Sequence, residues 1–324
     1  METIKTPLFT GFPNVLHAKQ FTLAFITEVL APEARRMREL IDAPGGHDQL
    51  RQELRHKILL SHFYEPSTRT RLSFEFAALH LGMHVLTTEN AGEFSSAAKG
   101  ETVAHSLKVI SLYRPDVIVM RHKQDGIASH IASHSRVPLI NGGDGRDQHP
   151  TQALLDIFTI FDEMGTVEDL TIGYGGDLAY SRVVRSGIFL LAKSKRIKFI
   201  LASDPRFRLG EDLKAHLQEH GVEFQETESM EYLIRRADVV YWTRTQTERI
   251  EDEALKADTP AIQQRFTIGL EEVSWMKPGA ILMHPMPIVW EIKEEVEDHP
   301  QALYLKQVEN GLFVRMALLK LILG

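Results

Sequence analysis

The sequence predicts an α/β protein with two doubly wound parallel-sheet domains that face a cleft and are linked by helices. Short apolar segments alternate with segments of helical periodicity, which is typical of parallel sheets covered by helices on both faces. The alternation restarts after a long helical segment, Thr151 to Met164, which we interpret as the domain connector. Polar residues follow most of the apolar segments, at the edge where open α/β sheets bind their ligands.

The composition limits the class of protein. A chain of 324 residues is long enough for two domains, and 43% hydrophobic and 25% charged residues are ordinary for a globular protein. A net charge of −7 argues against nucleic acid as the main partner, and no apolar run is long enough for a membrane span. Cysteine is absent and the N-terminus lacks a secretory pattern, so we expect a cytoplasmic protein without disulfides.

The expected elements of the first half begin with a helix from about Thr22 to Leu40 and a loop at 42–47. The apolar segment from Ile58 to Tyr64 indicates a buried strand. After it we expect a helix at 72–81 ended by Gly82, a strand at 84–88, a helix at 101–112, a strand at 116–120, a helix near 126–133, a strand at 137–141 and a glycine-rich loop at 142–150.

The second half repeats the pattern. We expect strands at 170–174, 197–202, 239–242 and 281–283, and helices at 181–192 and 211–219. A last helix from about Gly311 to Leu323 is strongly apolar on one face and therefore needs a packing partner.

The turn Glu65-Pro66-Ser67-Thr68-Arg69-Thr70-Arg71 joins the first buried strand to its helix. Backbone N–H groups at a helix start favour an anion, and Ser67, Thr68 and Thr70 add short donors. Arg69 and Arg71 add planar guanidinium groups that match phosphate oxygens. A polar helix cap with two solvated arginines is the simpler alternative, but this concentration of donors in one turn favours a phosphate cradle.

Further polar residues lie where the other predicted strands end. The first domain has Arg121 and the loop ending in His149, and the second has Arg182, Arg244 and Gln246. Two arginines and a glutamine suit a second anion, such as a dicarboxylate. No residue pair has the pattern of a nucleophile with its base, so we expect catalysis by positioning and oxyanion stabilisation.

Three weaker patterns are not interpreted as sites. Gly173-Tyr174-Gly175-Gly176 follows a strand, but the third glycine of a dinucleotide fingerprint would fall on Leu178. His130 and His134 have helical spacing without a carboxylate as third ligand, so we expect surface histidines. The stretch from Lys99 to Thr102 lacks the upstream glycine of a P-loop. No metal or organic cofactor is therefore expected.

Several motifs together resemble those of the carbamoyltransferases, and within that superfamily those of the aspartate carbamoyltransferase catalytic chains. The similarity runs in order from about residue 8 to the C-terminus. The motifs that carry it are Ser67-Thr68-Arg69-Thr70-Arg71, Ser95-Ser96-Ala97-Ala98-Lys99-Gly100-Glu101-Thr102, His149-Pro150-Thr151-Gln152, Gly176-Asp177-Leu178-Ala179-Tyr180-Ser181-Arg182, Thr243-Arg244-Thr245-Gln246-Thr247-Glu248-Arg249 and His284-Pro285-Met286-Pro287.

The resemblance implies a reaction: carbamoyl phosphate and L-aspartate give N-carbamoyl-L-aspartate and phosphate, an early step of pyrimidine synthesis. It also implies roles. The residues implied for carbamoyl phosphate are Ser67, Thr68, Arg69, Thr70, Ser95, Lys99, Arg121, His149, Gln152, Pro285 and Met286, of which Arg69, Thr70, Lys99, Arg121 and His149 are the catalytic candidates. Those implied for aspartate are Lys99, Arg182, Arg244 and Gln246. Arg71 then has a supporting role rather than contact with substrate.

The resemblance further implies how the chain is organised. Residues 1–150 would bind carbamoyl phosphate and be completed by a C-terminal helix at about 303–324, while 151–302 would bind the amino acid. The loop with Ser95 and Lys99 would reach a neighbouring subunit's site, which implies a homotrimer with shared active sites. Regulatory chains are a further class of partner that the resemblance allows.

One position departs from the family pattern. Aspartate carbamoyltransferases usually have arginine after the His-Pro-Leu-Pro motif, where this chain has Ile288. The change leaves two alternatives to an aspartate carbamoyltransferase: a carbamoyltransferase for another amino acid or amine acceptor, and a non-catalytic homologue that binds carbamoyl phosphate.

Overall fold

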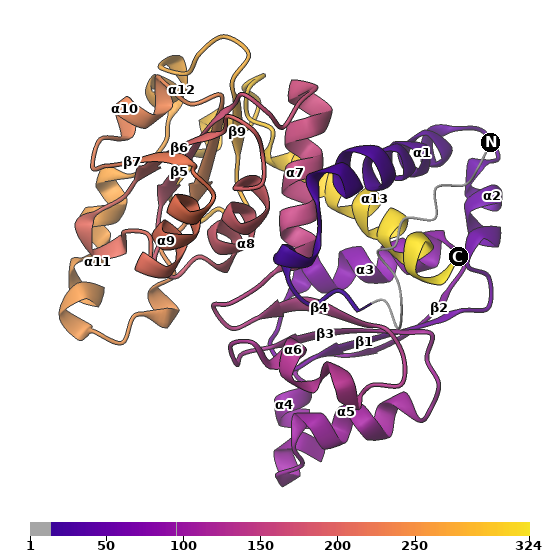
Figure 1. Ribbon diagram of the computed structural model, residues 1–324. Helices are drawn as coiled ribbons and strands as arrows, with labels where there is room; N and C mark the ends of the chain where they lie inside the picture. The colour runs from indigo at the N-terminus through magenta and orange to yellow at the C-terminus, as the bar shows by residue number, and fades with distance from the viewer. Residues whose placement is uncertain (1–13, 95) are drawn as a thin grey trace. The chain divides into compact units, whose positions relative to one another are not determined.

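Residues 14–94 and 96–324 are described by a computed structural model (Figure 1). The described chain forms two compact units, one within Met1–Gln20, Glu28–Thr151 and Gly311–Gly324, the other within Phe21–Thr27 and Gln152–Asn310. Each unit contains one parallel sheet with helices, which confirms the predicted α/β class. The boundary between Thr151 and Gln152 falls inside the long helix predicted as connector.

The first unit has a four-stranded sheet in the order β2-β1-β3-β4, with every pair parallel. A π-helical turn, Phe25–Leu30, leads into the first helix. The elements are α1 (Ala31–Asp42), α2 (Gly46–Glu53), β1 (Ile58–Phe63), α3 (Thr68–His80), β2 (His84–Thr88), α4 (Ala91–Phe94), α5 (Val103–Ser111), β3 (Val117–His122), α6 (Ile127–Ile131) and β4 (Leu139–Asp144).

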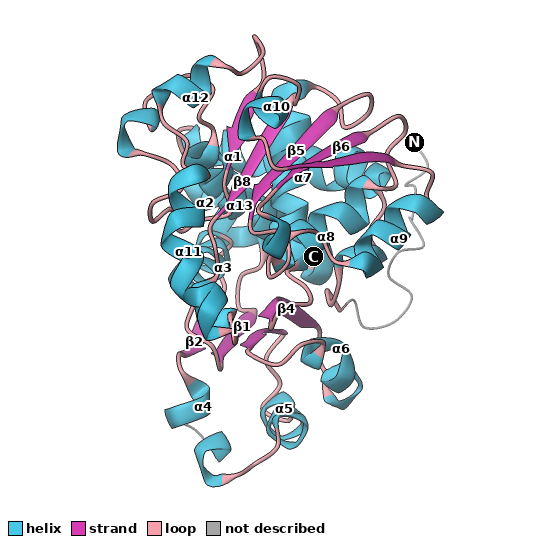
Figure 2. Cartoon of the chain, turned by 90° about the vertical axis from the view of Figure 1, so that its left-hand side faces the viewer, coloured by secondary structure: helices cyan, strands magenta, loops and turns pink. Residues whose placement is uncertain are grey.

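The second unit has a five-stranded parallel sheet in the order β7-β6-β5-β8-β9. Helices α8 and α9 lie on one face of this sheet, and α10 and α12 lie on the other (Figures 1 and 2). The elements are α7 (Pro150–Met164), β5 (Thr171–Gly176), α8 (Arg182–Leu191), β6 (Lys198–Ala202), α9 (Glu211–Glu219), β7 (Glu223–Thr227), α10 (Met230–Ile234), β8 (Val239–Thr243), α11 (Glu253–Arg265), α12 (Leu270–Ser274), β9 (Ile281–Met283) and α13 (Tyr304–Leu323).

The apolar strands form the centre of each unit because they are covered on both faces. Val117, Ile118 and Val119 of β3 are fully buried. In the second unit, Trp242 of β8 is buried in a large apolar cluster and donates its indole N–H to the carbonyl of Phe266 at 2.9 Å.

The C-terminal helix finds its apolar partner in the first unit from Gly311 onward, where it lies beside α1 (Figure 1). The guanidinium of Arg38 lies over the Phe313 ring at 5.5 Å. Lys320 pairs with Glu53 at 2.7 Å. Among the described residues, no helix is long and apolar enough to cross a membrane.

Three local predictions were wrong in ways that bear on the site. Helix α3 begins at Thr68 rather than at Leu72, so the cradle's hydroxyls and Arg69 belong to its first turn. Strand β4 continues through Gly142 and Gly143, which were predicted as loop. A Cβ on Gly142 would lie 3.2 Å from the carbonyl oxygen of Met120, so this glycine allows the strand to pack closely. Strand β7 and helices α2 and α10–α12 were not predicted.

Candidate active site

The predicted site residues gather at the switch points of the two sheets, where successive connections run in opposite directions. In the first sheet, β1 has β2 on one side and β3 on the other, and the cradle follows β1 while Arg121 is near the end of β3. In the second sheet, β5 and β8 occupy the corresponding position, and the turns that follow them carry Arg182, Arg244 and Gln246.

The cradle is the amino end of a 13-residue helix. Ser67 is the N-cap residue, in an extended conformation, and its side chain makes no capping hydrogen bond. No acidic residue lies in the first turn of α3, while Thr68 and Arg69 are exposed there. The positive end of the helix, the backbone N–H groups of its first turn and a guanidinium together favour an anion at this turn.

Thr70 and His149, which are 79 positions apart, meet inside the first unit. The Thr70 hydroxyl lies 3.3 Å from His149 Nε2, and both side chains are buried. The helix start after β1 and the chain segment after β4 are thus held together by a polar contact. This pair directly links two of the sequence motifs.

Arg121 is buried beside the cradle. Its Nη2 donates to Glu65 Oε1 at 2.9 Å, and its Nη1 donates to the Gly142 carbonyl at 3.3 Å. Burial lowers the pKa of Arg121; Glu65 opposes this, and the neighbouring positive charge of Arg69 adds to the lowering. The two arginines therefore concentrate positive charge at one place, and Glu65, which the sequence did not single out, balances it.

Arg71 forms ion pairs within the first unit. Its guanidinium pairs with Glu75 at 3.3 Å and with Glu89 at 3.0 Å, which ties α3 to the segment after β2. These partners could not be predicted from the sequence because Glu89 lies outside any motif.

In the second unit, buried Asp177 organises the turns that follow β5 and β8. Its carboxylate accepts from the backbone N–H of Tyr180 at 2.9 Å and of Gln246 at 3.0 Å. The Gln246 side chain in turn donates to the Tyr180 carbonyl at 2.8 Å. Burial raises the pKa of Asp177 to about 6, against these N–H donors. Gln246 is thereby fixed beside the start of α8.

The two arginines predicted for a dicarboxylate have different surroundings. Arg182 is the first residue of α8 and is buried. Arg244 Nη1 pairs with Glu248 Oε2 at 3.0 Å and also donates to the Thr245 carbonyl. The Arg244 charge is thus partly balanced by a neighbour one helical turn further on.

A buried polar network links Gln152 on α7 to the His284-Pro285-Met286-Pro287 segment after β9. Asp156 on α7 accepts from Gln152, from Tyr241 on β8 and from Gln307 on α13, at 2.9, 2.8 and 2.6 Å. The oxygen of Gln307 accepts from the backbone N–H of His284 at 2.9 Å. Sequence analysis missed Asp156, Tyr241 and Gln307; the position of Asp156 four residues after Gln152, on one helix face, was the available signal.

The His284 ring continues the network. Its Nδ1 accepts from the Met286 N–H at 2.9 Å, and its Nε2 lies 2.8 Å from Glu291 Oε1. Burial alone would raise the pKa of Glu291, but the contact with His284 holds it below the ordinary value. The backbone that carries the Pro285 and Met286 carbonyls is therefore fixed by two hydrogen bonds, one from the His284 N–H to Gln307 and one from the Met286 N–H to the His284 ring.

Two predicted residues lie in the segment between α4 and α5. Lys99 ends a 3₁₀ turn, Ser96–Lys99, and is exposed. Ser95 lies outside the described residues.

The glycines after Leu170 have packing roles. A Cβ on Gly175 would lie 1.9 Å from the Trp242 ring, and one on Gly173 would lie 2.5 Å from Leu233. These contacts explain the glycines without a dinucleotide.

Candidate metal ligands are few in the part of the chain that the structure describes. His130 and His134 are exposed, as expected for surface histidines. One described group has its ligand atoms within 4.8 Å of one another: His216, Glu219 and His220 at the end of α9. Glu219 and His220 are exposed, and none of the predicted site residues belongs to the group.

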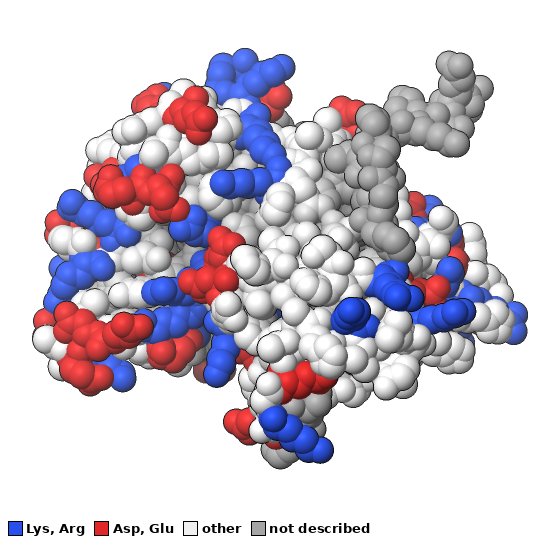
Figure 3. All heavy atoms as spheres, turned by 60° about the horizontal axis from the view of Figure 1, so that its bottom comes forward, with Lys and Arg blue, Asp and Glu red and all other residues white. Residues whose placement is uncertain are grey.

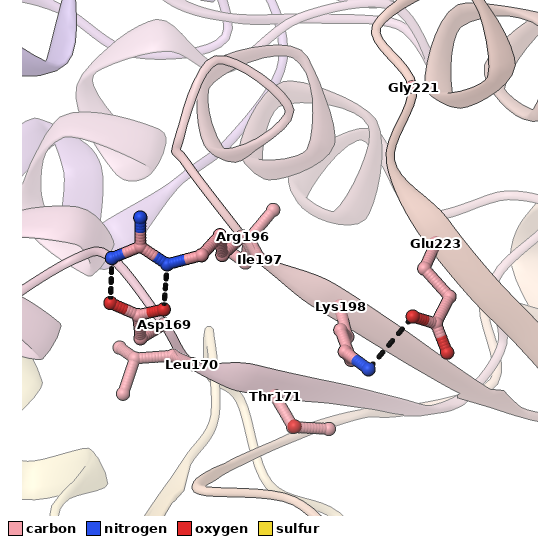
Figure 4. A pocket seen from close by; sticks show the side chains of 8 residues that line it. All are labelled: Asp169, Leu170, Thr171, Arg196, Ile197, Lys198, Gly221 and Glu223. Atoms are coloured by element: carbon pink, nitrogen blue, oxygen red, sulfur yellow. Dashed lines mark hydrogen bonds and ion pairs between the residues drawn. The ribbon is translucent and has the colours of Figure 1, made fainter.

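A surface pocket lies at the amino ends of β5, β6 and β7, opposite the edge that carries the candidate site (Figure 4). Its charges form internal pairs, Arg196 with Asp169 and Lys198 with Glu223. Acidic and basic side chains also alternate over the described residues on the face drawn in Figure 3. Neither surface has the concentrated positive charge of the cradle.

The fold and these motifs together define an α/β protein with polar and basic side chains at the switch points of two parallel sheets. The family model "Aspartate/ornithine carbamoyltransferase, carbamoyl-P binding domain" matches residues 14–162, and the model for the Asp/Orn binding domain matches residues 168–322. The chain belongs to the aspartate/ornithine carbamoyltransferase family, which confirms the resemblance inferred from its motifs.

Individual relatives agree with this assignment. The chloroplastic aspartate carbamoyltransferase of Arabidopsis thaliana is 41% identical over 310 residues, covering 96% of this chain and 77% of the relative. The catalytic subunit of Methanocaldococcus jannaschii aspartate transcarbamoylase has a TM-score of 0.85 at 39% identity, covering 95% of this chain and 97% of that one. A Trypanosoma cruzi aspartate transcarbamoylase in complex with N-(phosphonacetyl)-L-aspartic acid has a TM-score of 0.88 at 34% identity, covering 96% of both chains.

Proposed function

We propose that this chain transfers the carbamoyl group of carbamoyl phosphate to the amine of L-aspartate, giving N-carbamoyl-L-aspartate and phosphate. The observation that carries the proposal is the group at the first switch point, where Thr70 contacts His149 and Arg69 lies near buried Arg121. The relatives named aspartate carbamoyltransferase support the choice of both substrates.

The first unit would hold the phosphate. The start of α3 would supply backbone N–H groups with Ser67, Thr68, Arg69 and Thr70. Arg121 would contact both the phosphate and the carbonyl oxygen, and His149 would donate to that oxygen as it becomes an oxyanion. In the second unit, Gln152 and the carbonyls of Pro285 and Met286 would accept from the carbamoyl amine.

The aspartate carboxylates would be bound by Arg182, Arg244 and Gln246. The aspartate amine then attacks the carbonyl carbon, the bond from carbon to the phosphate oxygen breaks, and the departing phosphate takes the amine proton. No protein base is required, so the chain's contribution is to orient both substrates and stabilise the developing charges.

We also propose the domain roles and the assembly that this reaction implies. Residues 1–150 with the C-terminal helix bind carbamoyl phosphate, and residues 151–302 bind the amino acid. Ser95 and Lys99 act in a neighbouring subunit's site of a homotrimer; exposure of Lys99 in the single chain supports this. The absence of cysteine supports the cytoplasm as the compartment, although the Arabidopsis relative is named chloroplastic.

A ureido-product assay with carbamoyl phosphate and aspartate tests the proposal. We expect N-carbamoylaspartate in an amount equal to the phosphate released. Phosphate release without a ureido product, or neither product at millimolar substrates, would contradict the function.

Mixing two inactive variants tests the shared site. Lys99→Ala and His149→Ala chains, combined under conditions that exchange subunits, are expected to regain activity because some sites then receive both native residues. Mixtures that stay inactive after proven subunit exchange would refute sharing.

An alternative function is carbamoyl transfer to an amine other than aspartate, and one observation favours it. Ile288 stands where family members usually have arginine, and its side chain packs against the apolar core of the second unit instead of offering a charge. A different amine acceptor would then be preferred over aspartate.

A further inference from the structure

We infer that Asp156 is a positioning residue that sets which atoms Gln152 and the His284–Pro287 segment present to the carbamoyl group. The inference rests on the proposed function, because it concerns how the acceptor atoms for the carbamoyl amine are oriented. It assigns a role to a buried carboxylate that accepts hydrogen bonds from Gln152 and Gln307.

The first step is the orientation of the Gln152 amide. An ionised carboxylate only accepts hydrogen bonds, so the group of Gln152 that faces Asp156 Oδ1 at 2.9 Å must be its NH₂. The amide oxygen then points the other way. The Gln152 oxygen can therefore accept from an N–H of the carbamoyl group. In a flipped amide, the Gln152 NH₂ would face that N–H, and two donors cannot form a hydrogen bond.

The second step is the orientation of Gln307. Its NH₂ donates to the same Oδ1 atom at 2.6 Å, so its oxygen is left to accept from the His284 N–H at 2.9 Å. The first residue of the His284–Pro287 segment is thereby fixed by the same carboxylate. The His284 ring fixes the next part of the segment, because its Nδ1 accepts from the Met286 N–H.

The third step is the burial of the hydrogen-bond network around Asp156 and the role of Tyr241 as a donor in it. Asp156, Gln307 and His284 are all buried, so a reversed Gln307 amide could not find water as a substitute partner. Tyr241 donates to Asp156 Oδ2 at 2.8 Å. Burial, followed by the charge of Asp156, raises the pKa of Tyr241 well above its ordinary value, so the hydroxyl stays a donor. The donors on Asp156 thus come from three different elements.

The test removes the acceptor that orients both amides. In Asp156→Leu, Gln152 and Gln307 lose the oxygen to which their NH₂ groups donate, so we expect kcat to fall about tenfold or more. The affinity for inorganic phosphate, which the cradle would hold, should change less than about threefold. In Asp156→Asn, the amide oxygen can keep the Oδ1 position while the NH₂ group faces the Tyr241 hydroxyl, which can turn to accept, so kcat should stay within about threefold of wild type.

Two control variants separate positioning from packing. Glu163→Gln removes another contact between α7 and α13, the 2.5 Å pair of Glu163 with Lys306, and should leave kcat within about twofold. Tyr241→Phe removes a donor but leaves the acceptor of both amides in place, so its loss of kcat should be smaller than that of Asp156→Leu. Melting curves establish which variants are folded.

The outcomes are distinct. Wild-type chain without N-carbamoylaspartate would refute the proposed function itself. Active wild type together with unchanged kcat in Asp156→Leu, or with equal losses in Asp156→Leu and Asp156→Asn, would refute only the positioning role. If Asp156→Leu does not fold, Gln307→Leu is used, because it removes the link between Asp156 and the His284 N–H: lower kcat with nearly unchanged phosphate affinity supports the role, and unchanged kcat overturns it.

Discussion

At the scale of single residues, some charged side chains form ion pairs with other side chains, and others accept hydrogen bonds from backbone N–H groups. Arg71 has Glu75 and Glu89 beside it, whereas buried Asp177 has backbone N–H donors. The Arg71 and Glu75 side chains are only 17% and 12% exposed, so loss of one partner would leave a nearly buried charge. Burial of Asp177, which raises its pKa against the N–H donors, makes that carboxyl sensitive to pH.

Asp177 should make stability fall as pH rises from about 4 to about 6. Its pKa is raised to about 6 by burial in the folded chain, compared with about 3.9 when unfolded. Between these values only the folded chain keeps the proton, so protonation favours folding at low pH and that contribution is lost by about pH 6. The two pKa values correspond to at most about 3 kcal/mol.

Urea unfolding at pH 4 and pH 6.5 measures this contribution. In Asp177→Asn the decrease in free energy of unfolding between these pH values should be smaller than in wild type. Equal decreases would show that Asp177 does not titrate in this window.

Arg69 and Arg71 should differ sharply when replaced by alanine. Arg69→Ala removes an exposed guanidinium at the helix start, and we expect kcat/KM for carbamoyl phosphate to fall about 100-fold or more. Arg71→Ala removes the ion pairs with Glu75 and Glu89 and leaves buried Glu75 without its guanidinium partner, so it should keep kcat/KM within about threefold while lowering stability by about 3 kcal/mol. Steady-state kinetics of the two purified variants measure this, and similar losses in both would contradict the roles assigned to them.

Sequence patterns predicted those residues whose function depends on local spacing. Arg69 and Thr70 share a turn, and His149 precedes a helix, so motif and position indicated them together. Glu65 was missed although it lies in the same turn, because its role depends on a hydrogen bond from Arg121, which is 56 positions away in the sequence. Asp156 was missed for the same reason: two of its three donors, Tyr241 and Gln307, come from other elements.

At the scale of elements, β5 and β8 show how closely two central strands are fitted. Gly175 on β5 lies against the Trp242 ring on β8 in a position where a Cβ has no room. The Gly-Tyr-Gly-Gly stretch therefore serves sheet packing beside the second switch point.

Gly175→Ala should destabilise the chain by about 1–3 kcal/mol through overpacking. Gly92→Ala is the control, because its Cβ would meet only the Tyr64 carbonyl at 3.6 Å. On a Trp242→Leu background, Gly175→Ala should cost less than it does in wild type. Urea unfolding of the four variants gives these differences, and an equal cost on both backgrounds would rule out the clash with Trp242.

Element boundaries were predicted well where apolar runs are uninterrupted, as in β1 and β9. The predicted boundary was wrong in β4, where the strand continues through glycines. A strand was also missed where its sequence is rich in charged and polar residues. Strand β7 reads Glu-Phe-Gln-Glu-Thr and lies at the sheet edge, so it lacks the apolar signal of a buried strand. Helix α3 was predicted to start late because its polar first turn serves the cradle rather than the core.

At the scale of the whole molecule, alternation of strands and helices was sufficient to predict two parallel sheets, because parallel strands need crossover connections. The acidic net charge did not reveal an anion site, since the site depends on a few arginines at one helix start. The preferred acceptor is likewise a property of a few side chains, Arg182, Arg244, Gln246 and Ile288, and not of the fold.

The most direct measurement is therefore a comparison of acceptors at constant carbamoyl phosphate. Initial rates of ureido-product formation would be recorded for L-aspartate and for other amino acids and amines, and kcat/KM compared. We predict that aspartate has the highest kcat/KM, about 100-fold or more above any acceptor that lacks a side-chain carboxylate. A higher kcat/KM for another amine, or no ureido product from any of them, would contradict the account.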